Sequence, residues 1–193
     1  MAGKPVEVLV VGAEGVGKTC ATLWFVHNYH VHDDTPQLDF DTFECTVGDV
    51  AVALVDGPEV LLAETDAVWP MLYYEAHARR AAGILALFDL TRPQTLADAR
   101  TIVERTQRIR DRDDLAPLPV ALVGTHTDEP NARAAAAALG ASYAEACPRS
   151  GDNIHPAFTD AITAFLDVLP ALNDNDPGSP SPRARRRHRC THQ

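Results

Sequence analysis

The stretch G-A-E-G-V-G-K-T, residues 12–19, constrains the fold of this chain more than any other feature. It satisfies the pattern G-x-x-x-x-G-K-[ST], follows a β-branched apolar run that ends at Gly12, and precedes a helical pattern. Glycines let backbone N–H groups turn inward around a phosphate, and the amino end of a following helix adds positive potential. The stretch therefore predicts a phosphate-binding loop between a buried strand and a helix.

Two side chains of this loop have predicted chemical roles. Lys18 can bridge the β- and γ-phosphate oxygens of a nucleoside triphosphate, and the Thr19 hydroxyl can bind Mg²⁺. The residues expected to line the phosphates are Gly12, Ala13, Glu14, Gly15, Val16, Gly17, Lys18, Thr19 and Cys20.

Hydrophobic periodicity predicts strands alternating with helices along the rest of the chain. The expected strands are the run ending at Gly12, a hairpin over 39–55 that turns at Gly48-Asp49, 83–88, 119–124 and a short strand near Ala144. The expected helices are 17–28, 66–80 with Pro70 disturbing its start, 93–112, 131–139 and 153–169. This pattern predicts an α/β fold: a mostly parallel six-stranded sheet with one antiparallel hairpin edge and helices on both faces.

Composition favours one soluble globular domain. The chain has 193 residues, of which 46% are hydrophobic and 23% charged. No apolar run approaches the roughly 20 residues that span a bilayer, and no leader segment is expected. The four cysteines lack metal-ligand spacing, which predicts reduced thiols and a cytoplasmic location.

Charge divides the chain into an acidic body and a basic tail. Residues 1–182 hold 12 basic and 27 acidic residues, a net charge of -15, whereas five arginines lie between Arg183 and Arg189. An acidic body argues against nucleic-acid binding. The Pro/Ser-rich composition of the segment after Pro170 predicts disorder. We therefore expect a folded domain over 1–170 and a separate tail over 171–193.

Three segments beyond the phosphate loop resemble landmarks of the Ras superfamily of small GTPases over about residues 5–169. They are F-D-L-T-R-P-Q-T-L (88–96), V-A-L-V-G-T-H-T-D (120–128) and Y-A-E-A-C-P-R (143–149). The resemblance implies the Ras-like P-loop NTPase fold and a GTP/GDP ligand with Mg²⁺. It also implies that the protein acts as a signalling switch with slow GTP hydrolysis. It also implies contacts with effectors and exchange factors through residues 30–42 and 57–75.

The same resemblance assigns the base-binding residues. T-H-T-D resembles the guanine-reading [NT]-K-x-D, which places Thr125, His126 and Asp128 at the base, with Asp128 accepting from the guanine N1 and 2-amino groups. His126 replaces a lysine of the family. C-P-R resembles S-A-K, whose backbone contacts guanine O6, so Cys147, Pro148 and Arg149 fall at the base. Pro148 has no N–H to make that contact.

The resemblance places Mg²⁺ between Thr19, Asp56 and a threonine of the first switch segment. Thr35 is the candidate for that threonine, although it stands two residues earlier than the family spacing. Thr42 is an alternative, but it belongs to the strand pattern. A surface Asp-Thr-Pro turn around Thr35 is equally consistent with the sequence. Asp56 closes the second strand of the hairpin and would hold the metal through water.

Departures from the family pattern concern hydrolysis. In V-D-G-P-E-V, Glu59 and Val60 stand where the family has a γ-phosphate-binding glycine and a water-orienting glutamine. Gly57 is an alternative source of the N–H. Glu14 occupies a position that is usually small in Ras and Rho proteins. Its side chain would crowd an incoming arginine, whereas its carboxylate could alternatively attract one. The sequence thus predicts an intact phosphate cradle with impaired hydrolysis.

Features near the carboxyl end favour membrane association on the cytoplasmic face. Cys190 stands fourth from the end in C-T-H-Q, which matches the C-a-a-X prenylation pattern except for its non-aliphatic middle residues. Together with the arginines of Arg183–Cys190, a lipid would give a two-signal anchor. The alternative is a nuclear-localisation or nucleic-acid-binding tail.

Three functions remain open from the sequence. The first is a slowly cycling guanine-nucleotide switch, leaning toward the Rho branch through D-A-V-W-P-M-L-Y (66–73) and the basic tail. The segment between Asp128 and Tyr143 is, however, too short for the extra helix of Rho proteins. The second is a pseudo-GTPase, an interaction module that binds nucleotide weakly or permanently without turnover. The third is an ATP-using P-loop kinase.

Overall fold

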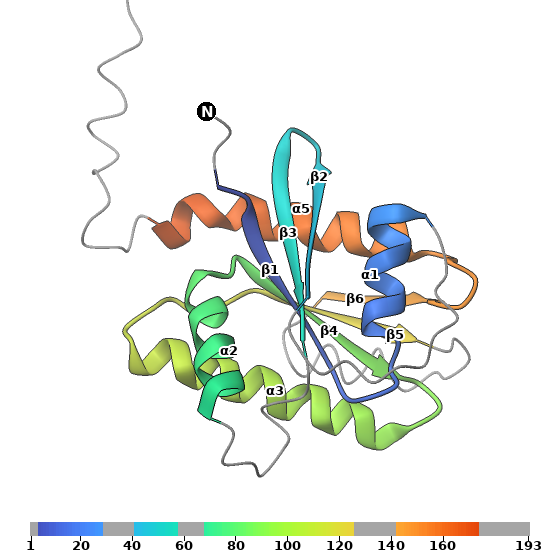
Figure 1. Cartoon of the computed structure of the whole chain (residues 1–193), viewed down its shortest axis with the longest axis horizontal. Helices are drawn as coiled ribbons and strands as arrows, with labels where there is room; N and C mark the ends of the chain where they lie inside the picture. Colours follow the sequence, from blue (N-terminus) through green and yellow to red (C-terminus); the bar gives the residue numbers. More distant parts are fainter. Residues whose placement is uncertain (1–3, 29–40, 58–67, 126–141, 174–193) are drawn as a thin grey trace, which may run out of the picture.

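A single six-stranded sheet organises the described part of the chain (Figure 1). The computed structural model describes residues 4–28, 41–57, 68–125 and 142–173. The strand order is β2-β3-β1-β4-β5-β6, and only the β2·β3 pair is antiparallel. The strands are β1 (Val6–Val11), β2 (Asp41–Val47), β3 (Val50–Asp56), β4 (Gly83–Asp89), β5 (Val120–Thr125) and β6 (Ser142–Ala146). The predicted sheet is confirmed.

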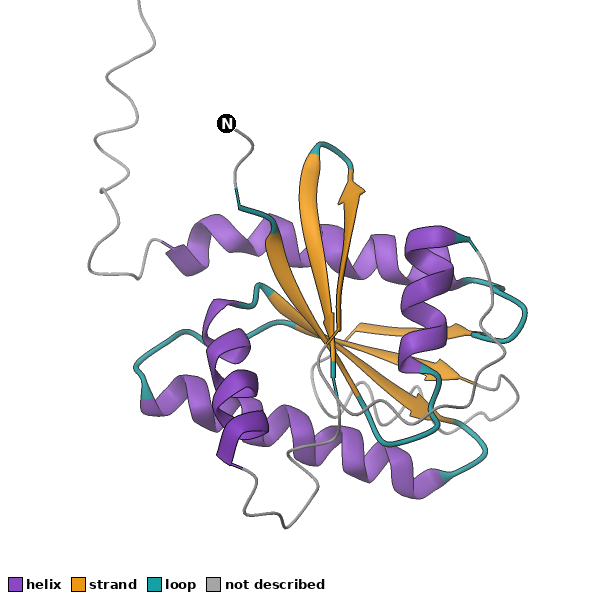
Figure 2. Ribbon diagram, viewed as in Figure 1, coloured by secondary structure: helices purple, strands orange, loops and turns teal. Residues whose placement is uncertain are grey.

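Four helices within the described ranges cover the two faces of the sheet (Figure 2). They are α1 (Lys18–His27), α2 (Val68–Arg80), α3 (Pro93–Arg112) and α5 (Ile154–Asn173). Successive residues of β1 point to opposite faces, so Val8 and Val10 pack with α1 and α5 while Leu9 and Val11 pack with α2 and α3. This two-sided burial explains why the central strands read as continuous apolar runs.

The predicted elements agree with the structure except at some ends. Helix α2 begins at Val68, and Pro70 lies in its first turn, where the missing N–H has no intrahelical partner in any case. The hairpin turns at Gly48, as predicted. The helix predicted over 131–139 lies outside the described residues.

Helix α5 runs four residues beyond its predicted end at Leu169 and finishes at Asn173. Proline was expected to stop the helix, but Pro170 removes only one backbone donor near the carboxyl end. The buried side chains Phe158, Ile162 and Phe165 hold the preceding turns against the sheet and offset that loss. The boundary of the folded domain itself stays a prediction. Within the described residues, no helix has the length and apolar character to cross a membrane.

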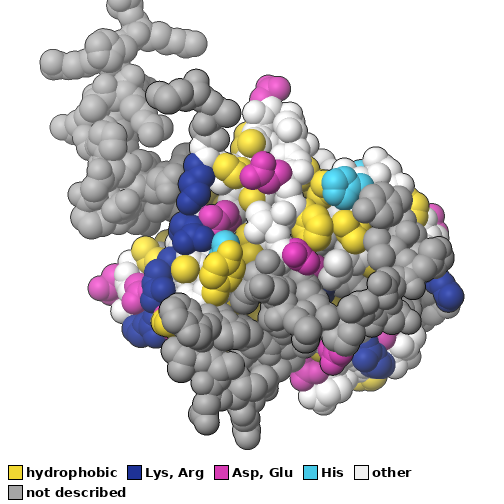
Figure 3. Space-filling model, viewed as in Figure 1, with side chains coloured by type: hydrophobic (Ala, Val, Ile, Leu, Met, Phe, Trp, Pro, Cys, Tyr) yellow, Lys and Arg dark blue, Asp and Glu magenta, His cyan; other side chains and the backbone are white. Residues whose placement is uncertain are grey.

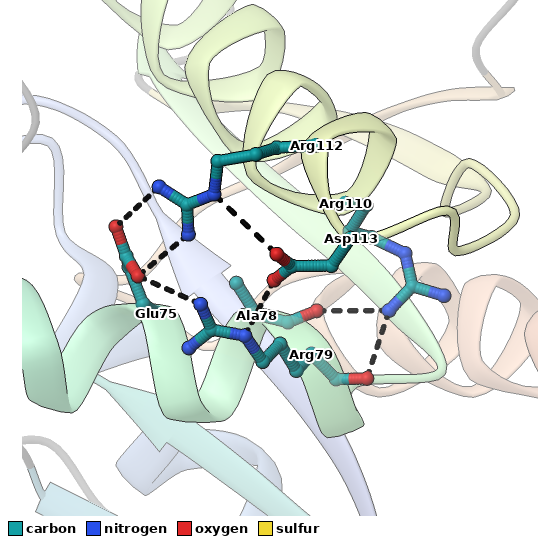
Figure 4. Close-up of polar contacts among 6 residues, drawn as sticks. All are labelled: Glu75, Ala78, Arg79, Arg110, Arg112 and Asp113. Atoms are coloured by element: carbon teal, nitrogen blue, oxygen red, sulfur yellow. Dashed lines mark hydrogen bonds and ion pairs between the residues drawn. The ribbon is translucent and has the colours of Figure 1, made fainter.

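A polar network joins α2 to the end of α3 (Figure 4). Glu75 accepts from Arg79 and Arg112, and Asp113 accepts from the same two arginines. These exposed ion pairs contribute little to stability individually because water screens them. Arg110, which lies beside these ion pairs, is buried, and its partners are backbone carbonyls instead of carboxylates.

Arg110 links three backbone carbonyls from two segments. Its Nε donates to Ala116 O at 2.6 Å, and its Nη1 donates to Ala78 O at 2.9 Å and Arg79 O at 3.0 Å. The side chain is buried, and burial lowers the pKa of its guanidinium. The carbonyls of Ala78 and Arg79 belong to the last turn of α2, which has no intrahelical donors for them. Arg110 therefore caps α2 from α3.

Lys and Arg side chains gather along one side of the molecule, toward α2 and the end of α3 (Figure 3). Most of this charge is neutralised locally. Arg80 pairs with Glu7 at 2.9 Å and Lys4 pairs with Glu7 at 3.7 Å, while Arg79 and Arg112 share Glu75. Through these ion pairs the basic side chains connect α2 to neighbouring segments. They do not form a surplus of positive charge.

Replacing Arg110 by alanine is expected to lower the free energy of unfolding by about 3 kcal/mol, because three carbonyls lose a charged donor in a buried site. Chemical denaturation of the full chain measures this. The matched control is Arg108→Ala, whose side chain is 76% exposed and whose loss should change stability by less than about 0.5 kcal/mol. Equal effects of the two substitutions would contradict the capping role.

Candidate functional site

The strand order creates a topological switch point at the carboxyl end of the central strand β1. The chain leaves β1 toward β2 and β3 on one side, then crosses from β3 to β4 on the other. Ligands of open α/β sheets bind at such a switch point, outside the carboxyl ends of the strands. The segment 12–17 follows β1 at this point and leads into the amino end of α1 (Figure 1). The predicted phosphate loop thus lies where the topology places a ligand.

The loop conformation fits a phosphate cradle. Gly17, the amino cap of α1, has φ +89° and ψ 23°, a left-handed conformation that favours glycine. A Cβ at this position would lie 2.9 Å from Pro148 Cγ, so a side chain would also clash with the neighbouring loop. The first N–H groups of α1 are directed beyond this cap, as in an anion site at a helix amino end.

Lys18 closes over the loop from the first turn of α1. Its buried Nζ donates to the carbonyl oxygens of Gly12 and Ala13, each at 3.1 Å. The ammonium group is therefore held above the loop, close to the inward-turned backbone. This is where a lysine can reach phosphate oxygens.

Thr19 and Asp56 form the candidate metal site. Thr19 Oγ donates to Asp56 Oδ2 at 2.7 Å, which links the start of α1 to the end of β3. Asp56 is fully buried, and burial raises the pKa of its carboxyl to about 6. The Thr19 hydrogen bond, Lys18 and the backbone N–H of Gly57 lower that pKa, whereas Asp41 across the hairpin raises it. A buried carboxylate beside a hydroxyl offers the oxygen ligands that Mg²⁺ prefers.

The 147–149 loop packs against the phosphate loop. Cys20 Sγ donates to Pro148 O at 3.0 Å. The loop is closed by Gly151 N donating to Cys147 O at 2.8 Å and Cys147 N donating to Asp152 O at 2.9 Å. Thr125 is buried at the end of β5, with its Oγ donating to Phe88 O at 3.1 Å. Of the residues predicted at the base, those that the structure describes, Thr125 and 147–149, are thus brought to the same end of the sheet as the phosphate loop.

The Cys147 thiol interacts with its neighbours in the same loop. A hydrogen bond with the Ser150 side chain, supported by the backbone N–H groups of Ser150 and Arg149, lowers the pKa of the Cys147 thiol. Pro148 has no backbone N–H. The loop therefore lacks, at this position, the backbone donor that the resemblance implies.

Several predicted site residues lie outside the described ranges. They are Thr35, Glu59, Val60, His126 and Asp128, and their roles stay predictions. The alternative metal ligand Thr42 belongs to β2 and pairs with Val55 in the hairpin. Gly57, the alternative γ-phosphate donor, directly follows Asp56, and its backbone N–H lowers the pKa of that carboxyl.

Sequence reasoning missed two residues beside the loop. Asp89 ends β4 and binds Arg92 Nε at 2.7 Å, and Arg92 Nη2 donates to the carbonyl of Glu14 at 3.2 Å. The signal was a carboxylate at the last strand position with an arginine three residues later. That spacing does not reveal that the arginine turns toward β1.

Comparison with known proteins agrees with this geometry. The family model described as "Ras family" matches residues 7–167. Protein ras-1 of Neurospora crassa is 26% identical over 166 residues, which cover 81% of this chain and 74% of that relative. The family match includes all six strands of the sheet, apart from Val6 at the start of β1, and the described residues of the candidate site. The chain belongs to the Ras family, whose members are small GTPases that bind guanine nucleotides, typically with Mg²⁺.

Proposed function

We propose that this protein is a guanine-nucleotide switch that binds GTP and GDP with Mg²⁺ and hydrolyses GTP slowly. One observation carries the proposal: Lys18 Nζ, the Thr19–Asp56 pair and the Gly17 helix cap, which come from the start of α1 and the end of β3, meet at the switch point of the sheet. This combination has the cation, the metal ligands and the backbone donors that phosphoryl groups need. Family membership supports the same function.

The chain's own residues divide the work of binding. Lys18 and the backbone N–H groups of the loop would hold the phosphates, and Thr19 and Asp56 would hold Mg²⁺, with Thr35 as a further predicted ligand. The metal, when bound, neutralises charge that develops on the phosphate oxygens. Thr125, His126 and Asp128 would bind the base.

Slow hydrolysis is argued from two positions. Val60 stands where a glutamine would orient the attacking water, and its aliphatic side chain has no hydrogen-bonding atom. Glu14 is exposed at the rim of the phosphate loop, so a carboxylate borders the route of an arginine supplied in trans. Both features favour a long-lived GTP state.

A pseudo-GTPase is the second candidate function, and the base-side loop favours it. Pro148 lacks the N–H that the resemblance would direct at guanine O6. Guanine O6 would then lose a backbone donor, which weakens binding of the base. In this case the fold would act as an interaction module.

Partner binding through 57–75 has support on α2. The large apolar side chains of Leu72 and Tyr73 are 51% and 50% exposed. Neighbouring exposed apolar residues are typical of protein-contacting surfaces. Effectors and exchange factors are proposed to use this surface and residues 30–42. The leaning toward the Rho branch stays a prediction.

Substituting Asp128→Asn should abolish the preference for guanine over adenine nucleotides, because an amide cannot accept from both guanine donors. Competition of GDP and ADP against a fluorescent GDP measures this preference. Asp160→Asn, an exposed substitution on α5, is the matched control and should leave base choice unchanged. Adenine preference in the unmodified protein would contradict the proposal and support the kinase alternative. Failure to bind either nucleotide would support the pseudo-GTPase.

Magnesium binding is expected to weaken between pH 7 and pH 5, because the Asp56 carboxyl takes up a proton with a pKa of about 6. Protonation removes the charged ligand, so affinity falls by up to about tenfold per pH unit below pH 6. Without metal the sign reverses: the raised pKa means that this group destabilises the fold as pH rises from about 4 through 6. Calorimetric titration of the GDP-loaded protein with Mg²⁺ gives the affinity. Free GDP over the same range is the control, and an identical pH dependence for both would refute the role of Asp56.

Membrane association of the tail belongs to the same proposal and rests on the sequence pattern alone. Each arginine near an anionic surface contributes about 1 kcal/mol, and a lipid on Cys190 would supply the second anchor. In eukaryotic cells, the full chain is expected in the membrane fraction and Cys190→Ser in the supernatant. The same distribution for both would argue against lipid attachment and leave the tail as a basic recognition segment.

A further inference from the structure

We propose that Arg92 is a positioning residue for the phosphate loop: anchored by Asp89, it holds the carbonyl of Glu14 outward and thereby directs the N–H of Gly15 into the loop. The inference rests on the proposed function, because the group to which that N–H would donate is a nucleotide phosphate. It assigns a role to a side chain outside the motif at residues 12–19.

The anchor of Arg92 is rigid because the Asp89 carboxylate accepts three hydrogen bonds. Asp89 is 4% exposed at the carboxyl end of β4. Its Oδ1 accepts from Thr91 N at 2.8 Å and Thr91 Oγ at 2.7 Å, and its Oδ2 accepts from Arg92 Nε at 2.7 Å. A buried carboxylate with three donors keeps one orientation, so it fixes the near edge of the guanidinium.

The backbone of Arg92 is fixed as well. Arg92 N donates to Asp89 O at 3.0 Å, which closes a turn. Thr95 Oγ donates to Arg92 O at 2.7 Å and accepts from Asp89 N at 2.9 Å. The Thr95 side chain is itself buried. These contacts clamp the β4–α3 junction on which Arg92 stands.

From this base the guanidinium spans the distance to the phosphate loop. Arg92 Nη2 donates to Glu14 O at 3.2 Å. The same nitrogen would lie 3.4 Å from a Cβ built on Gly15, so the guanidinium rests directly against that residue. Gly15 has φ +71°, a left-handed conformation that glycine adopts without steric strain.

Peptide geometry converts this contact into an effect on binding. A trans peptide is planar, so its C=O and N–H point in opposite directions. When Arg92 draws the carbonyl of Glu14 outward, the N–H of Gly15 must point away from Arg92. The carbonyls of Gly12 and Ala13 turn instead to Lys18 Nζ. Two cations thus sort the loop carbonyls and leave the N–H of Gly15 for an anion.

The test uses the full-length protein loaded with fluorescent GDP, with dissociation followed after addition of excess GDP. Arg92→Gln is expected to speed dissociation about tenfold or more, the effect of losing one charge-assisted hydrogen bond. Arg100→Gln is the matched control: it lies on the same helix, is 50% exposed and approaches Glu104 only at 4.0 Å. Its rate should stay within about twofold of the parent rate. Equal rates for the two variants would overturn the proposal.

A second readout separates positioning from general stability. The ¹H–¹⁵N resonance of Gly15 reports the environment of its amide, and Gly151 serves as the reference glycine. Arg92→Gln should move the Gly15 resonance and speed its hydrogen exchange while Gly151 and the unfolding midpoint hardly change. Faster dissociation with an unaltered Gly15 amide would overturn the positioning role.

The two proposals fail differently. If the parent protein does not bind GDP, the proposed function fails. The Gly15 amide comparison in nucleotide-free protein then still decides whether Arg92 orients the loop. If the parent binds GDP and Arg92→Gln behaves as Arg100→Gln does, only the role of Arg92 is lost.

Discussion

The 2.7 Å hydrogen bond from Thr19 Oγ to Asp56 Oδ2 joins the two segments on which the site depends. It can form because Val10 and Asp56 are partners in the β1·β3 register, so the end of β3 lies beside the loop that follows β1. The register in turn depends on two-sided burial of β1 between the α1/α5 and α2/α3 layers. A one-residue slip would reverse which face each β1 side chain occupies.

Asp56 fits the proposed metal site. Enclosing a carboxyl group disfavours its charged form, which raises its pKa to about 6. Under the proposed function, a bound metal ion would compensate the charge of this carboxylate and offset the cost of burying it. Lys18 and Arg92 give further support from α1 and from the β4–α3 junction, and Pro148 packs against Gly17 from the other side. The loop is therefore held by contacts from several separate segments.

The sequence predicted features that depend on local patterns. The phosphate loop, the hairpin, the sheet composition and the bounds of α3 follow from motif spacing and periodicity. It did not predict that Arg92 reaches Glu14 O or that Cys20 binds Pro148 O, because each contact joins residues far apart in the sequence. The separation is 78 positions for the first contact and 128 for the second. The predicted end of α5 was wrong because the tertiary packing of Phe158 and Phe165 outweighs the tendency of Pro170 to end a helix.

We propose that this protein combines an intact phosphate cradle with weak hydrolysis. The most direct measurement is to purify the full chain gently, denature it, and identify and quantify the released nucleotide by chromatography. The account predicts guanine nucleotide in near-stoichiometric amount, with a substantial share of GTP. Protein that emerges empty, and that takes up no GTP in the presence of Mg²⁺, would contradict it.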